Sequence, residues 1–427
     1  MEVERLHRPE LRGKPVVIGG RPGSRGVVAA CSYEARALGV HSAMPMGQAY
    51  RRVKAQGGMP QRDIQVHFLH EGLYGNYSRY SRKVQEILRG AVPVFNSKSI
   101  DEFEMDLSGC ERLFKRDYGG MAPFAEYLRR RVREEVGLPL SIGIGPSRIA
   151  AKMASRHAKP DGVFVVPPDQ LRGFLAPHGI EDVPGIGPVT AAALHRLGVR
   201  RVGELLRLPP RLLRHTFGIG MARLLHALEG RGDEAADGSY FGYDGEAGDE
   251  ERPGPSSRQP KSIGHETTFE RDVADRAVLM RTLWRLSENA CRRLRAKNLR
   301  ARHVTVKIRY SDFATLTHGG FLPAAASVES VIFKRACELF AEGNTRRLRI
   351  RLLGVRLSRF SAGTPQQQIF AGACERSEDD FFTTVDCIRE RYGQESVLVG
   401  PGVMRLAEQR PPEANSTAGI PSAFLPQ

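Results

Sequence analysis

The residues best suited to chemistry lie in segment 99–106, where Asp101 and Glu102 stand side by side at an expected turn between two apolar stretches. Adjacent carboxylates repel each other unless a cation lies between them. In a chain whose formal net charge is +16, such an acidic turn is suited to holding Mg²⁺ against a phosphate backbone. The alternative interpretation is an ordinary solvated acidic turn.

A second pattern fits contacts with a polyphosphate. Tyr33 and Arg36 share one face of a short predicted helix, where they present a hydroxyl and a planar guanidinium together. Lys159 lies in a predicted loop from which its ammonium could reach the same phosphates. The ordinary alternatives are surface packing for the pair and a solvated charge for the lysine.

A third pattern is typical of a helix–hairpin–helix. The run 182–199 places Gly185 and Gly187 in a turn between two predicted helices. Glycines let the backbone of such a turn approach a phosphate, and the N–H groups at the start of the next helix face the anion. The run therefore predicts contacts with a DNA backbone, and a tight turn between packed helices is the alternative.

The composition bounds the class of protein. The 427 residues include 64 Lys and Arg against 48 Asp and Glu, a surplus that favours a polyanionic partner over a membrane surface. No segment reaches the roughly 18 apolar residues of a membrane span, and the start lacks a signal-peptide core. The six cysteines form no CxxC pair, so neither a disulfide framework nor a zinc site is indicated. We expect a reduced cytoplasmic protein with no membrane partner.

The elements that must position these residues follow from the hydrophobic pattern. Short strands alternate with helices, and the two acids lie on a hairpin, which predicts an α+β catalytic core. A small helical region is expected at 179–228. The predicted strands are 16–18, 27–30, 93–95, 105–107 and 140–144, and the predicted helices are 33–38, 46–53, 72–88 and 118–136.

The second half of the chain differs in composition. Residues 237–259 are rich in Gly, Pro, Ser and acids and predict a linker. Residues 261–360 predict a second α+β unit with a helix around 279–294 and two alternating strands. A last helical piece is expected at 381–392. The outer faces of the alternating strands carry basic residues that we expect to bind DNA, namely Lys307, Arg309, Arg349 and Arg351.

Taken together, these motifs resemble the Y-family of DNA polymerases, and most of all its bacterial polymerase IV type. The matching stretches occur in the family's order from the start of the chain to about residue 360. Each stretch alone is weak evidence, whereas six in register are specific. They are residues 9–16, 32–36, 99–102, 141–145, 158–162 and 183–187.

The resemblance implies a right hand of palm, fingers and thumb, followed by an α+β little finger that grips duplex DNA. We divide the chain accordingly into six parts. They are the fingers with a truncated palm start (1–70), the palm (71–168), the thumb with the helix–hairpin–helix (169–236), the linker (237–260), the little finger (261–360) and a tail (361–427).

The resemblance also implies roles for the candidate residues. Asp101 would ligate the catalytic metals, two Mg²⁺ in the family, and Glu102 would ligate a metal or help activate the primer 3′-hydroxyl. Tyr33, Arg36 and Lys159 would hold the incoming dNTP. The primer hydroxyl would attack the α-phosphate in line. Primer–template DNA, with damaged templates tolerated, is the expected substrate of a monomer associated with the nucleoid.

The sequence departs from the family at its start. Family members begin with an apolar strand that carries Asp-x-Asp and two aromatic residues, and this sequence starts after that strand. Ala30 replaces a phosphate-contacting Thr and Glu104 replaces a common aromatic, while Asp106 matches the family and is interpreted as structural. We expect this polypeptide to be impaired in catalysis, with a start codon placed too far downstream as the explanation. The alternative is a non-catalytic, DNA-binding and clamp-binding remnant.

A short segment beyond the little finger resembles the peptide by which bacterial polymerases bind the sliding clamp. It consists of Gln366, two further glutamines, and the aliphatic–aromatic pair Ile369 and Phe370. Such a pair can fill an apolar pocket on the partner. The alternative is a polar tail of random sequence.

Overall fold

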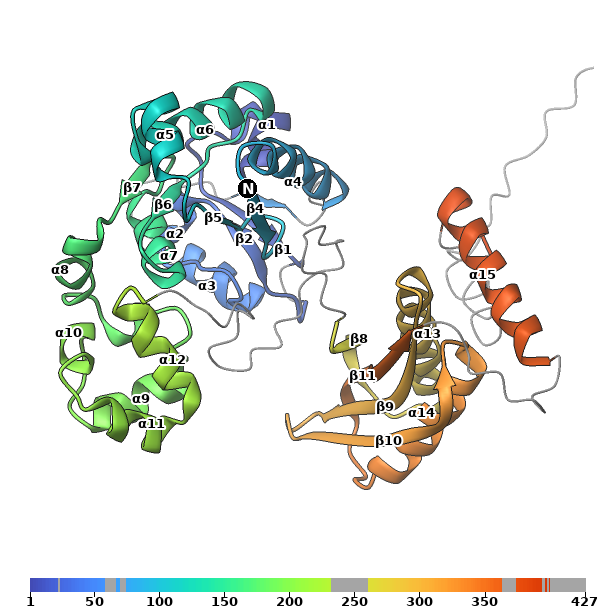
Figure 1. Ribbon diagram of the computed structural model, residues 1–427. Coiled ribbons are helices and arrows are strands. Elements are labelled where there is room, and N and C mark those ends of the chain that lie inside the picture. The colour runs from blue at the N-terminus through green and yellow to red at the C-terminus, as the bar shows by residue number, and fades with distance from the viewer. Residues whose placement is uncertain are drawn as a thin grey trace, which may run out of the picture. The chain divides into compact units, whose positions relative to one another are not determined.

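The computed structural model describes residues 1–21, 24–57, 67–69, 74–231, 260–362, 374–393, 396–397 and 399. The chain divides into two compact units, residues 1–257 and 258–427. Figure 1 shows helices and strands interleaved along both units. The linker expected at 237–260 lies outside the described residues except for Pro260, and Gln366, Ile369 and Phe370 lie outside them as well.

A small sheet begins the first unit. Its part of the chain comprises α1 (Glu2–His7), the 3₁₀ turn η1 (Pro9–Leu11), β1 (Val16–Gly19), β2 (Val28–Cys31), α2 (Tyr33–Ala37), α3 (Met46–Gly57) and β3 (His67–Leu69). The strand order is β2-β1-β3, with β2 antiparallel and β3 parallel to β1. The central strand is apolar, largely β-branched and buried along its length, which fits its position between two neighbours.

The middle of the first unit carries the acidic hairpin. Its elements are α4 (Tyr74–Arg89), β4 (Val94–Ser97), β5 (Phe103–Asp106), α5 (Glu111–Tyr118), α6 (Met121–Val136), β6 (Ile142–Ile144), α7 (Arg148–His157) and β7 (Val163–Val165). β4 and β5 form an antiparallel pair, and β6 and β7 form a separate parallel pair. Phe95 of β4, Leu128 of α6 and Ile142 of β6 share one hydrophobic cluster, so α4 and α6 unite the two pairs through side chains.

The helix predicted at 118–136 is confirmed as α6, which begins at Met121, three residues later than expected. The predicted start falls on the turn at Gly119 and Gly120, whose φ angles are +85° and +138°. Only glycine adopts such angles without strain, and Gly119 in the left-handed region ends α5. The preceding helix α5 was not predicted.

The last part of the first unit is helical, as expected for 179–228. It contains η2 (Pro168–Gln170), α8 (Leu171–Leu175), η3 (Ile180–Asp182), α9 (Pro188–Arg196), α10 (Val202–Leu205), α11 (Pro210–Phe217) and α12 (Ile219–Leu228). Its core includes Leu175, Leu194 and Leu224, and α7 contributes Met153 to the same cluster. Helix α7 therefore packs against the β6–β7 pair and against the helical region that follows.

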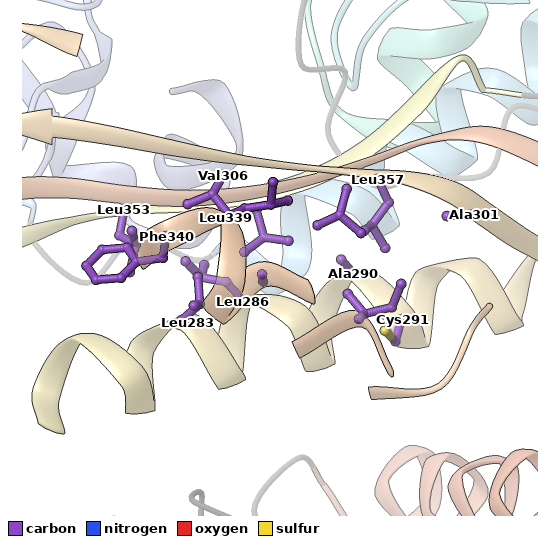
Figure 2. Close-up of a cluster of buried hydrophobic side chains, with 14 of the residues drawn as sticks. Leu283, Leu286, Ala290, Cys291, Ala301, Val306, Leu339, Phe340, Leu353 and Leu357 are labelled. Atoms are coloured by element: carbon purple, nitrogen blue, oxygen red, sulfur yellow. The ribbon is translucent and has the colours of Figure 1, made fainter. Parts of the chain in front are cut away.

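The second unit is a four-stranded antiparallel sheet with two helices on one face. Its elements are β8 (Ser262–Val273), α13 (Arg276–Ala296), β9 (Leu299–Tyr310), β10 (Thr315–Ala326), α14 (Glu329–Gly343), β11 (Ile350–Ala362) and α15 (Cys374–Tyr392). The strand order is β10-β9-β11-β8. Figure 2 shows Leu283, Leu286 and Ala290 of α13 facing side chains of the sheet such as Val306 and Leu357.

The alternation predicted for the first of the two strands is confirmed, since Val304, Val306, Ile308 and Tyr310 of β9 are all buried. The alternation predicted around residues 348–352 is partly wrong. Ile350 and Leu352 are buried as predicted, whereas Leu348 is 40% exposed and precedes β11. The register shifts between Ile350 and Leu352, as at a β-bulge, and the inward residues of β11 beyond it begin at Leu353.

The last helix is longer than predicted, because α15 begins at Cys374. It is joined to the unit by ion pairs of Arg295 with Asp386 and of Arg389 with Glu288, each at 2.7 Å. Across the described part of the chain, no helix has the length and apolar character needed to cross a membrane.

Candidate active site

Asp101 and Glu102 lie at the tip of the β4–β5 hairpin, as predicted. The backbone N–H groups of Lys98 and Ser99 donate to the carbonyl oxygen of Glu102 at 2.9 and 3.2 Å. The Ser99 hydroxyl donates to Oδ1 of Asp101 at 2.6 Å and accepts from the Asp101 backbone N–H at 3.3 Å. The backbone and one serine thus fix the turn, and the Asp101 carboxylate is exposed.

Glu102 faces the basic helix α7. Its Oε1 lies 2.6 Å from Nζ of Lys152, and both side chains are a little over two-fifths exposed. The start of α7 is fixed by Ser147, whose hydroxyl accepts the Ala150 N–H at 3.3 Å. An acid at the hairpin tip and a cation on the helix therefore share one site.

A second ion pair lies beside the first. The Glu104 carboxylate bonds the guanidinium of Arg148 and lies 3.3 Å from Nζ of Lys98. Glu102 directly precedes β5 and Glu104 lies on it, while Arg148 and Lys152 are neighbours on one face of α7. Sequence analysis missed Arg148 and Lys152, although their four-residue spacing directly after a predicted strand was a usable signal.

Tyr33 and Arg36 lie on α2, which starts at Ser32. The Ser32 hydroxyl accepts the N–H of Ala35 at 3.2 Å and that of Val16 at 3.0 Å, so one side chain caps the helix and ties it to β1. The Tyr33 side chain is 51% exposed and Arg36 is exposed. Within the described ranges neither side chain makes a hydrogen bond or an ion pair, which leaves both available to a ligand.

Helix α1 borders both α2 and the acidic turn. Arg5 pairs with Glu34 of α2 at 2.7 Å. Burial would raise the pKa of Glu34, but hydrogen bonds from its own backbone, Ser32 and Arg5 lower it overall. Burial lowers the pKa of the Met1 α-amino group, and the nearby carboxylates, including that of Asp101, oppose this effect. Helix α1 thus contacts the helix that bears Tyr33 and Arg36, and the Asp101 carboxylate is close enough to Met1, just before α1, to affect its amino group.

Lys159 follows the end of α7 and is exposed. It lies seven residues beyond Lys152, or roughly 10 Å along a helix axis. Asp161 anchors its loop, because its carboxylate accepts the Leu140 N–H at 3.1 Å and pairs with Arg129 at 3.1 Å. The basic residues of α7 and this loop therefore extend from the acidic turn to the position of Lys159.

The predicted helix–hairpin–helix turn is present, with one difference. Gly185 has a φ of +97°, which favours glycine, and Gly187 is the N-cap of α9. Val183 and Ile186 are buried, so the turn is anchored in the helical core. The segment before it is a single 3₁₀ turn, η3, where the sequence analysis expected a full helix.

The basic residues predicted on the second unit lie around the β9–β11 pair. Lys307 pairs with Glu266 of β8 at 2.6 Å, and Nε of Arg309 donates to the Thr315 hydroxyl at 2.9 Å. Arg349 is exposed and lies just before β11. Arg351 lies at the bulge and stacks over Phe313, 4.5 Å from the ring centre. Phe313 and Phe321 are about two-thirds exposed and were not singled out from the sequence.

The acidic turn fits Mg²⁺ by its donor chemistry. In the described ranges no group of three or more His, Cys, Asp or Glu residues could hold a metal. Asp101 and Glu102 nevertheless supply hard oxygen donors, and Mg²⁺ is commonly held by one or two carboxylates together with waters and substrate phosphates. Lys152 is the group that competes with a cation for Glu102.

Comparisons with known proteins agree on one family. Residues 1–156 match the impB/mucB/samB family, and residues 260–369 match the C-terminal domain of that family. DNA polymerase IV of Dehalococcoides mccartyi (strain CBDB1) is 37% identical over 402 residues, which cover 94% of each chain. DNA polymerase IV of Halorhodospira halophila (strain DSM 244 / SL1) is 36% identical over 373 residues, which cover 86% of this chain and 94% of that one.

Solved structures confirm the predicted fold class. A Y-family DNA polymerase chimera of Dbh and Dpo4 superposes with a TM-score of 0.68 at 23% identity, and the match covers 84% of this chain and 96% of that one. The insertion ternary complex of Dbh DNA polymerase gives a TM-score of 0.52 at 22% identity with the same coverage. At this level of identity the likeness is one of fold, an α+β arrangement shared along most of the chain.

Proposed function

Since the chain belongs to the Y-family of DNA polymerases, of the polymerase IV type, we propose that it adds dNTPs to a primer 3′ end opposite damaged templates. The observation that carries the site assignment is the 2.6 Å contact between Glu102 and Lys152. It unites a carboxylate pair suited to a divalent cation with a helix face suited to phosphates, as nucleotidyl transfer requires.

Tyr33, Arg36 and Lys159 bind the triphosphate in this proposal. All three side chains are exposed and none has a hydrogen-bonding or ionic partner in the parts of the chain that the structure describes. Arg36 offers a planar donor fork and Lys159 a compact charge, while the Tyr33 hydroxyl adds a neutral donor. Such groups orient the α-phosphate and balance the negative charge on the departing pyrophosphate.

Asp101 and Glu102 hold Mg²⁺ in this proposal, and the bound ion supplies charge neutralisation and a more acidic primer hydroxyl. The primer 3′-hydroxyl would lose its proton to solvent water as its oxygen attacks the α-phosphorus in line; a new phosphodiester bond would form, and the bond to the bridging oxygen would break to release pyrophosphate. Exposed Asp101 and half-exposed Glu102 face the solvent from which the substrates arrive.

DNA is held through its phosphates in the same proposal. Gly185 and Gly187 approach one stretch of backbone, and Lys307, Arg309, Arg349 and Arg351 contact another. Contacts of this kind position the duplex without reading its sequence. The predicted clamp-binding residues Gln366, Ile369 and Phe370, and the monomeric state, stay predictions.

A non-catalytic, DNA-binding and clamp-binding protein is the second candidate. It would keep the phosphate contacts proposed above and lack nucleotidyl transfer.

Primer extension with Mg²⁺ and dNTPs tests this proposal. Asp101→Asn should remove the extension that the original chain catalyses, because it removes a carboxylate ligand of the cation, and it should leave the affinity for primer–template DNA unchanged. Equal extension by Asp101→Asn and the original chain would contradict the cation site. Failure of the original chain to extend a primer that it binds would favour the non-catalytic candidate.

A further inference from the structure

The acidic hairpin and α7 are connected by two parallel ion pairs, Glu102 with Lys152 and Glu104 with Arg148. From these we propose that Glu104, acting through Arg148, is a positioning residue that sets where the Asp101–Glu102 turn lies relative to α7. The inference rests on the proposed function, because it concerns the same cation site. Glu104 itself stands where the resemblance leads one to expect an aromatic residue.

The two acids and the two cations pair at two levels along α7. Glu104 lies on β5 and Glu102 directly precedes that strand, while Arg148 and Lys152 share one face of α7. Two ion pairs at two levels restrict both rotation and sliding of the hairpin against the helix, whereas one pair would restrict rotation less. This constraint adds to the apolar packing of Phe95 and Phe103 in the hairpin's hydrophobic cluster.

When a cation binds, only one of the two ion pairs can stay intact. Lys152 bonds the same carboxylate that the cation needs, so that contact must loosen. Glu104 and Arg148 lie one level further from the tip, and their side chains are only 28% and 30% exposed. Lys98, between the two strands, is a further partner of Glu104 at 3.3 Å. The Glu104–Arg148 pair can therefore hold the hairpin in both states.

A positioning role and a purely electrostatic role predict different effects on metal affinity when a neighbouring cation is removed. Removing a cation next to a metal site should tighten metal binding if only the local charge matters. Removing Lys152 should do so, since Lys152 competes directly for Glu102. Removing Arg148 should weaken metal binding if Arg148 holds the turn in place, because the loss of outer partners of a metal site commonly costs 10–100-fold in affinity. Removal of Lys152 and removal of Arg148 should therefore change the metal affinity in opposite directions.

The test is a titration of the full chain with Mn²⁺, in the presence of primer–template DNA and a non-hydrolysable dNTP, with free Mn²⁺ measured by electron paramagnetic resonance. Arg148→Gln should weaken Mn²⁺ binding about 10-fold and Lys152→Gln should strengthen it. Arg148→Lys keeps the charge and should stay within about 2-fold of the original chain. The double variant Glu104→Gln/Arg148→Gln should weaken Mn²⁺ binding no more than the more affected single variant, because both substitutions remove the same interaction.

Arg131→Gln provides the matched control, since it breaks the Arg131–Glu135 ion pair on α6, also at 2.7 Å, and should leave Mn²⁺ binding unchanged. Unchanged thermal unfolding of Arg148→Gln excludes general loss of structure as the cause. Binding that needs Asp101 but is equal or tighter in Arg148→Gln would overturn the role of Glu104 alone. Mn²⁺ binding that is indifferent to Asp101→Asn would overturn the proposed cation site and the role of Glu104 with it.

Discussion

The candidate site residues differ in whether they already have a protein partner. Glu102 and Glu104 have cationic partners on α7, whereas the side chains of Tyr33, Arg36 and Lys159 have none within the described ranges. Groups without a protein partner break no protein contact when a triphosphate arrives; they exchange water hydrogen bonds for charge-assisted bonds to phosphate oxygens.

Lys159→Ala should weaken dNTP binding to the protein–primer–template complex by roughly 10-fold to 100-fold, because a hydrogen bond to a charged group contributes about 1.5–3 kcal/mol. Affinity for the primer–template itself should stay within about 2-fold. Fluorescence titration with a labelled dNTP, followed by one with labelled DNA, measures the two separately. Lys115→Ala, at an exposed position of α5, is the control. Equal losses in both affinities would argue against a triphosphate role for Lys159.

At the scale of elements, the attachment of α15 rests on a buried charge network. The Arg295 guanidinium bonds both oxygens of Glu329 at 2.9 and 2.7 Å and Oδ2 of Asp386 at 2.7 Å. Glu329 is fully buried, and burial raises its pKa against the opposing effect of Arg295. Phe382 of α15 adds a buried ring, with Arg295 stacked over it.

Arg295→Met should lower the free energy of unfolding of the second unit by about 3–5 kcal/mol, because it leaves two carboxylates buried without their cation. Urea unfolding followed by the fluorescence of Trp284 reports on this unit, since Trp284 is the only tryptophan in the sequence and lies buried in α13. Arg335→Met breaks a half-exposed pair with Glu338 on α14 and should cost under about 1 kcal/mol. Similar losses in both variants would show that the buried network contributes no more than a surface pair.

For the whole molecule, charge governs the association with DNA. The formal net charge of +16 is spread over both units, and the residues proposed to contact DNA are of types that bind phosphates. Each neutralised phosphate releases condensed counterions, so the logarithm of the binding constant should fall linearly with the logarithm of salt concentration.

Arg349→Ala should reduce the magnitude of that slope by about one and weaken binding to unrelated duplex sequences equally, because the contact is to phosphate. Fluorescence anisotropy at several salt concentrations measures both effects. Lys334→Ala, exposed on α14, removes the same charge from the helical face of the unit and should leave the slope unchanged. A duplex affinity that does not vary with salt would point to a partner other than nucleic acid.

Much of this protein followed from local sequence. Apolar alternation is a property of adjacent residues, so the part of β9 from 304 to 310 was predicted, although the strand begins at Leu299. The turn that carries Asp101 and Glu102 was placed correctly between two strands. Where glycine angles or a bulge decide the backbone, the same patterns were insufficient. Gly119 and Gly120 form the turn between α5 and α6, so α6 begins three residues later than predicted, and the bulge at Arg351 changes which residues of β11 face inward.

The sequence by itself determined the family, the α+β elements and the residue types of the site, because these depend on short motifs whose order survives divergence. Only the tertiary structure decided that Arg148 and Lys152 face Glu104 and Glu102, and that α15 returns to α13. The contacts concerned join residues that are 44 positions apart or more, such as Glu104 with Arg148 and Arg295 with Asp386. Such contacts depend on how helices and sheets pack, and no local pattern of side chains encodes that packing.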